Sequence, residues 1–139
     1  MPTLCKQERL FEKRLLATLF GRGKRFSCNN EDGLLRICYL SVPGTEVWPD
    51  KTPESPHISC KILVSAPKSR FRHAVDRNRI KRLLREAYRF HKDSFSDLVP
   101  EESVLLLSFQ FAGGEVSLPC MSRLVEKTAK TLQNRLGHA

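Results

Sequence analysis

A basic segment in the middle of the chain is the feature that most constrains its fold. Lys68 to Lys92 reads KSRFRHAVDRNRIKRLLREAYRFHK and carries ten Lys or Arg residues against two acids, Asp76 and Glu86. At about 100° per residue, helical geometry divides this segment into two faces. One face collects Ile80, Leu83, Leu84, Ala87 and His91, and the opposite face collects Asn78, Lys81, Arg82, Arg85, Arg89 and Lys92, with Arg77 and Arg79 at the borders. We therefore predict an amphipathic helix that docks along its apolar side and presents cations outward.

The apolar patterns on both sides of this segment predict a sheet and two further helices. Branched and aromatic residues indicate strands at 34–42, 58–66 and 103–111, with a shorter one at 24–28, and helical spacing indicates helices at 7–20 and 121–136. Four prolines between residues 43 and 57 remove backbone donors, which predicts an exposed loop there. The near-continuous apolar run at 103–111 predicts a strand buried on both faces. The expected fold is a single α/β or α+β domain over residues 1–139, a two-layer sandwich of helices on a mixed, roughly four-stranded sheet.

The charge balance predicts a polyanionic partner. The chain has 24 Lys and Arg against 15 Asp and Glu, a formal net charge of +9. Cations spaced three or four residues apart on one helix face repel one another, and a bound polyanion would relieve that repulsion. Most of the cations are Arg, whose planar guanidinium pairs with phosphate oxygens and stacks on bases. These features favour nucleic acid over an ordinary solvated face, which usually mixes charges of both signs.

Other features limit the remaining classes of function. Apolar runs long enough to cross a bilayer, about 18 to 20 residues, are not found, and the charged first residues do not fit a signal peptide, so we expect a cytoplasmic protein without a membrane partner. The five cysteines form no C-x-x-C pair, which indicates reduced structural thiols rather than a metal site. Dispersed histidines and the lack of a nucleophile motif or a phosphate-binding glycine loop argue against independent catalysis. A structural, ribosome-associated RNA-binding protein remains the main alternative, while a helix docked along one side argues against duplex DNA reading.

Two sequence motifs resemble one known family. RNRIKRLLREAYR, from Arg77 to Arg89, with the preceding VSAPKSRFRHAVD, resembles the signature of the bacterial ribonuclease P protein. LLATLFGRGKRFS, from Leu15 to Ser27, resembles that family's first helix and the turn after it. The resemblance implies a left-handed crossover around the central helix, against the usual preference. It also implies that the partners are a catalytic RNA and precursor transfer RNA, that the RNA cleaves the 5′ leader, and that Mg²⁺ is held mainly by the RNA and the substrate.

The resemblance also assigns roles to single residues. It places basic and amide side chains of the central segment against the catalytic RNA, namely Lys68, Arg70, Arg77, Asn78, Arg79, Lys81, Arg82 and Arg85. Arg89 is added to this set because it lies on the same outward face of the predicted helix. In the family, a cleft between the first helix and the sheet binds the leader with aromatic side chains of that helix. Phe20 matches one such position, whereas Leu16 stands at the other, so apolar packing replaces base stacking there. Arg36 and Tyr39 are the predicted leader contacts on the sheet, although the sequence leaves open which strand face lines the cleft.

Overall fold

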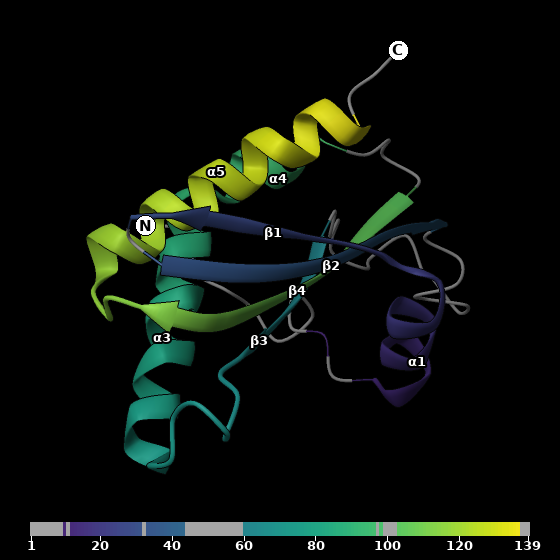
Figure 1. Cartoon of the computed structure of the whole chain (residues 1–139). Helices are drawn as coiled ribbons and strands as arrows, with labels where there is room; N and C mark the ends of the chain where they lie inside the picture. The colour runs from purple at the N-terminus through teal and green to yellow at the C-terminus, as the bar shows by residue number, and fades with distance from the viewer. Residues whose placement is uncertain are drawn as a thin grey trace.

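The computed structural model describes residues 10, 12–31, 33–43, 60–96, 98 and 103–136. The described strands form one four-stranded sheet in the order β1-β2-β4-β3. Their bounds are β1 Lys24–Asn30, β2 Gly33–Pro43, β3 Cys60–Ser65 and β4 Ser103–Gly114. Strands β1, β2 and β4 pair antiparallel, whereas β3 pairs parallel with β4. The predicted mixed sheet is confirmed, and Figure 1 shows α1 at one end of it, α3 at the other end and α5 running along it.

Two long helices cover one face of the sheet. They are α3 (Ala74–Phe90) and α5 (Leu118–Leu136), with the short helix α4 (Lys92–Ser96) between α3 and β4. The buried side of α3 consists of Ile80, Leu83, Leu84, Ala87 and Tyr88. Each fully buried Ile or Leu side chain stabilises the fold by roughly 1.5–3 kcal/mol. The predicted docking face is therefore confirmed for Ile80, Leu83, Leu84 and Ala87, with Tyr88 added to it. His91 was also predicted there, but it follows the last residue of the helix and is only partly buried.

The main core lies between these helices and the sheet. Tyr88 lies 5.3 Å from the ring of Phe95 and 6.3 Å from the ring of Phe109, measured between centroids. His91 Nε2 lies 2.8 Å from Ser122 Oγ, which ties the end of α3 to α5. Strand β4 is buried at most positions on both faces, as its apolar run predicted.

Helix α1 (Lys13–Arg22) packs on the opposite face of the sheet. Its buried Leu15 and Leu19 meet Cys38 and Leu106 in a second, smaller core cluster. The helix ends where the Gly23 N–H bonds to the Leu19 carbonyl at 2.7 Å, and a side chain at Gly23 would collide with that carbonyl. Thus α1 turns sharply into β1 and holds its last turn over the sheet.

Several predicted boundaries change. The first helix begins at Lys13, because Glu12 has extended backbone, and it continues through Gly21. Strand β4 runs through Gly113 and Gly114 because both still pair with β2. The predicted loop at 43–57, except Pro43, and the start of the 58–66 strand lie outside the described residues. The chain joins the parallel strands β3 and β4 through α3 and α4, and the left-handed sense of that crossover stays a prediction.

Candidate nucleic-acid interface

The outward face of α3 is one part of the candidate interface. Asn78, Arg79 and Arg82 are exposed, whereas Lys81, Arg85 and Arg89 are partly covered. Lys68 and Arg70 are exposed in the turn that precedes the helix. The face therefore presents guanidinium and ammonium groups along more than three turns of helix, where a phosphate backbone can reach them.

Arg77 has a structural contact that the sequence did not indicate. Its Nη1 donates to the carbonyl oxygens of Phe71, at 2.7 Å, and Arg72, at 3.1 Å. The Phe71 ring also stacks against Phe111 on β4, with centroids 5.9 Å apart. Arg77 thus fixes the turn that carries Lys68 and Arg70 as well as standing on the border of the basic face.

A groove in the sheet is the second part of the interface. It has a volume of about 440 Å³, and its lining residues are Phe20, Arg25, Phe26, Ser27, Arg36, Ile37, Cys38, Leu63, Ser65, Ser108 and Gln110. Residues paired across neighbouring strands point to the same face of a sheet. One such row crosses all four strands as Ser27, Arg36, Gln110 and Ser65. The floor of the groove is therefore a polar row, although the opposite face of the same strands is core.

A second row of paired residues lies nearer α1. It runs as Arg25, Cys38, Ser108 and Leu63. Burial raises the pKa of the Cys38 thiol above its ordinary value of 9.0, while the neighbouring Arg25 guanidinium opposes this shift. The thiol is therefore neutral at physiological pH, and it lies 3.6 Å from the Leu19 carbonyl oxygen that accepts from it.

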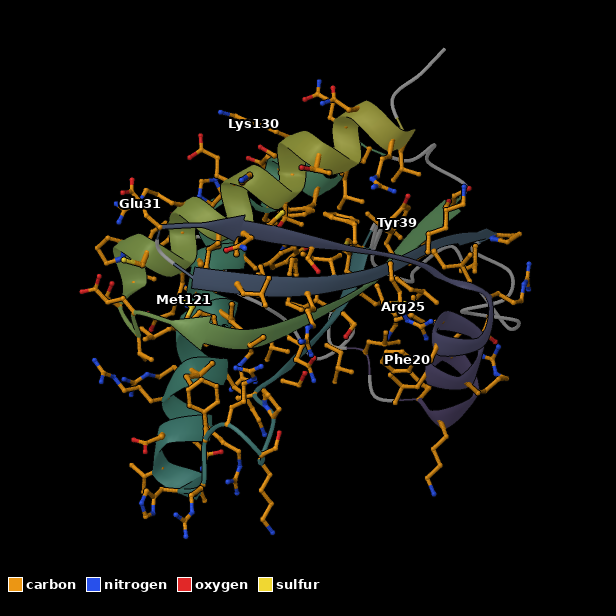
Figure 2. All side chains as sticks on the ribbon, viewed as in Figure 1. Phe20, Arg25, Glu31, Tyr39, Met121 and Lys130 are labelled. Atoms are coloured by element: carbon orange, nitrogen blue, oxygen red, sulfur yellow. The ribbon has the colours of Figure 1, made fainter. Side chains whose placement is uncertain are left out.

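Helix α1 supplies one wall of the groove. The Phe20 side chain is 42% exposed although it is large and apolar. Arg25 Nη2 donates to the Phe20 carbonyl at 2.8 Å, so the two side chains come from segments that are tied together. Figure 2 shows Phe20 and Arg25 close together on the α1 side of the strands. An exposed ring beside guanidinium groups can stack on an unpaired base.

The structure revises the predicted leader contacts. Phe20, which matches an aromatic position of the family, and Arg36, one of the two predicted sheet residues, both line the groove. Leu16 is partly buried against the smaller core cluster and is not a lining residue. The placement of Tyr39 in the cleft is wrong, because Tyr39 is 4% exposed and lies in the main core beside Phe26, with ring centroids 5.7 Å apart. Figure 2 shows it on the α5 side of the strands.

Sequence reasoning also missed five polar residues of the groove. These are Arg25, Ser27, Ser65, Ser108 and Gln110. They come from three strands and lie in the two rows described above, which appear only once the order and register of the strands are known. Arg25 alone had a usable signal, because it belongs to the turn after the first helix that resembles the family.

A short turn connects the groove to the basic helix. Ser65 lines the groove at the end of β3, and the exposed Lys68 follows three residues later. Figure 1 shows α1 and α3 at opposite ends of the sheet with this connection between them. Among the described residues, no three His, Cys, Asp or Glu side chains gather as metal ligands. Likewise, no described helix is long and apolar enough to cross a membrane.

Fold and site together define a small basic α/β protein whose cationic helix and polar sheet groove suit nucleic acid. The family model described as Ribonuclease P matches residues 4–113. The ribonuclease P protein component of Porphyromonas gingivalis strain W83 is 40% identical over 101 residues, which cover 73% of this chain and 64% of that protein. The corresponding protein of Chlorobium phaeobacteroides is 33% identical over 138 residues, covering 95% of this chain and 87% of that protein. The chain belongs to the ribonuclease P protein family.

A solved structure shows the same fold. The Staphylococcus aureus RNase P protein superposes with a TM-score of 0.55 at 16% sequence identity, over 89% of this chain and 94% of that one. The chain spans slightly less than two thirds of the Porphyromonas relative, because the match covers 64% of its length.

Proposed function

We propose that this chain is the protein subunit of a ribonuclease P ribonucleoprotein, which removes the 5′ leader of precursor transfer RNA. Family membership supports the assignment. The observation that carries it is the pairing of a cationic helix with a separate groove on one small domain. Two surfaces of this kind suit a protein that holds a catalytic RNA and a substrate strand at the same time.

The outward face of α3 binds the catalytic RNA in this proposal. Arg82 and Arg79 are exposed and make paired, charge-assisted hydrogen bonds to phosphate oxygens. Asn78, which is uncharged, donates to and accepts from a base edge or a 2′-hydroxyl. Arg77 acts mainly by holding the turn that carries Lys68 and Arg70 toward the same RNA.

The groove binds the single-stranded leader. Phe20 stacks on a leader base, since the ring is exposed and every base has a stacking face. Arg36 and Gln110, which are neighbours across β2 and β4, offer hydrogen bonds to the edge of that base. Arg25 provides positive charge at the α1 end, where the leader phosphates pass.

Cleavage belongs to the RNA subunit in this proposal. Mg²⁺, held mainly by the RNA and the substrate, would supply the activation of the attacking water. The residues of this chain bind and orient: α3 holds the RNA, and the groove keeps the leader extended away from the cleaved bond. The protein would raise the cleavage rate by positioning, because a bound and oriented substrate loses less entropy on the way to the transition state.

Reconstitution tests the proposed function. Precursor transfer RNA labelled at its 5′ end is cleaved at low magnesium by a bacterial ribonuclease P RNA from a related organism, with and without this chain. We expect the chain to restore cleavage at the mature 5′ end. Binding to the RNA without any gain in cleavage would instead assign the chain to structural RNA-binding proteins.

A further inference from the structure

A partly buried ion pair lies beneath the first helix, outside the groove lining: its lysine is buried, whereas its glutamate side chain is 31% exposed. Lys61 on β3 is 2% exposed, and its Nζ lies 3.0 Å from Oε1 of Glu12, the residue just before α1. Lys61 lies opposite Leu106 of β4, and Leu106 lies opposite Leu40 of β2. These three residues form the next row to the groove, on the same face of the sheet. A Lys is rarely buried in this way without a partner, so its pairing with Glu12 is a specific feature of the α1 contact.

The ion pair belongs to a set of contacts that hold α1 at both ends. At the start, the Leu10 N–H also bonds to the Ile62 carbonyl of β3, at 2.7 Å. At the end, Arg25 of β1 donates to the Phe20 carbonyl, at 2.8 Å. Because β3 and β1 are the two edges of the sheet, α1 spans the sheet and is fastened at each edge. The fastening at β3 therefore helps to determine where Phe20 stands over the polar row.

Stability alone does not account for a charged pair at this place. Leu15 and Leu19 already bury the apolar side of α1. Apolar replacement of a buried ion pair is often neutral or stabilising, because removing two charges from water is costly. Glu12 Oε2 is also buried, and in the part of the chain that the structure describes it has no hydrogen-bond partner. An ion pair differs from apolar packing in being directional, so it fixes one position of the helix.

We propose that Lys61 and Glu12 are positioning residues that set the position of α1 and thereby the opening of the groove for the leader. The inference rests on the proposed function, since it concerns how the same groove accepts its strand. Neither residue of the pair lines the groove. It acts through α1, which carries Phe20, and through the distance from Phe20 to Arg36 and Gln110.

A double substitution tests this role. Lys61→Met with Glu12→Leu replaces the ion pair by apolar side chains. The matched control is Lys130→Met with Glu126→Leu, which removes an exposed pair 3.7 Å apart on α5. Holoenzymes reconstituted with each protein are titrated with precursor transfer RNA and with the same transfer RNA lacking its leader. The ratio of the two affinities measures the contribution of the leader, and thermal unfolding is recorded alongside.

We expect the core double variant to lower that ratio at least about fivefold while its Tm is kept and its binding to the catalytic RNA is unchanged, because preorganisation is lost but packing is not. The exposed control should keep the wild-type ratio. Glu12→Gln, which keeps the shape and a hydrogen bond but not the charge, should lower the ratio to a smaller extent and serves if the double variant does not fold. A wild-type ratio in Glu12→Gln and in a folded double variant would overturn the inference. A ratio near one in the wild type would instead overturn the proposed function.

Discussion

Arg82 and Arg77 stand on the same helix, yet they have different surroundings. Arg82 is exposed, whereas the Arg77 guanidinium is partly covered and donates to two carbonyl oxygens of the preceding turn. Loss of the Arg82 side chain should therefore weaken RNA binding without changing the stability of the fold. Loss of Arg77 should also loosen the turn, so its effect on RNA binding cannot be assigned to one contact.

Arg82→Ala should weaken binding to the catalytic RNA about threefold to tenfold, since a typical hydrogen bond contributes about 0.5–1.5 kcal/mol net. Its Tm should change by less than about 3 °C, as is usual for exposed positions. Lys130→Ala is the control, because it removes the same charge from α5, and it should leave RNA affinity near the wild-type value. A large loss of stability in Arg82→Ala would contradict its outward placement.

Phe20 and Tyr39 provide a second test at the scale of single residues. Phe20→Ala should reduce the leader contribution to affinity about fivefold or more, because base stacking on an aromatic ring is worth about 1–3 kcal/mol. Tyr39→Phe keeps the buried ring beside Phe26 and should leave that contribution unchanged. Filter binding of precursor transfer RNA with and without its leader measures both. If Tyr39→Phe lowered the leader contribution to affinity and Phe20→Ala did not, the assignment of the two sheet faces would be reversed.

Helix α3 and strand β2 differ in how well the sequence predicts which of their residues face outward. The outward and inward residues of α3 followed from helical spacing, because one helix face is strongly apolar and the other strongly charged. Strand β2 has no such contrast, since Ile37, Cys38 and Tyr39 are all buried in succession. The face that lines the groove was therefore not predictable. The burial of Lys61 was also not predictable from the sequence, because a buried ammonium group in a strand is explained only by the position of α1.

At the scale of elements, the contact of α1 with β2 should depend on pH through Cys38. Burial raises the pKa of this thiol above 9.0, so the folded state retains its proton at a pH where the unfolded chain has lost it. Stability contributed by the neutral thiol is complete below the unfolded value and decreases as the pH rises toward the raised pKa.

The free energy of unfolding should therefore decline between about pH 8 and pH 10, and Cys38→Ala should decline less steeply over the same range. Urea unfolding at several pH values measures the difference between the two proteins. Because Lys and Tyr groups titrate in both, only the difference reports on Cys38. Parallel curves for the two proteins would show that this thiol does not couple to the packing of α1.

The order of the elements was easier to predict than their register. Alternating helix and strand signals gave the sandwich and its roughly four strands, because each segment has its own period. In the groove row, Gln110 and Ser65 are joined to Arg36 by pairings of β4 with β2 and β3, and β4 is far from both of these strands in the sequence. Such pairings leave no local pattern, which is why Gln110 and Ser65 were not among the predicted contacts.

For the whole molecule, the positive charge and the two-surface arrangement lead to a strong dependence on salt. The chain carries a net charge of +9, and ten of its cations lie between Lys68 and Lys92. If at least four phosphates are neutralised, the logarithm of the association constant should fall with the logarithm of salt concentration with a slope of roughly −3 to −4. Titration of the catalytic RNA at increasing KCl measures it. A flat response would exclude α3 as the main RNA contact.

The groove beside α1 and the outward face of α3 are two separate surfaces, and crosslinking distinguishes what binds to each. The holoenzyme is reconstituted in two samples, one with 4-thiouridine at single leader positions of the precursor transfer RNA and one with 4-thiouridine in the catalytic RNA. Both samples are irradiated and analysed by peptide mass spectrometry. We predict leader crosslinks around Phe20 and Arg25 and on the strands at Arg36 and Gln110, with crosslinks of the catalytic RNA on α3. Leader crosslinks confined to α3, or to the α5 side of the sheet, would contradict the binding of the leader in the groove.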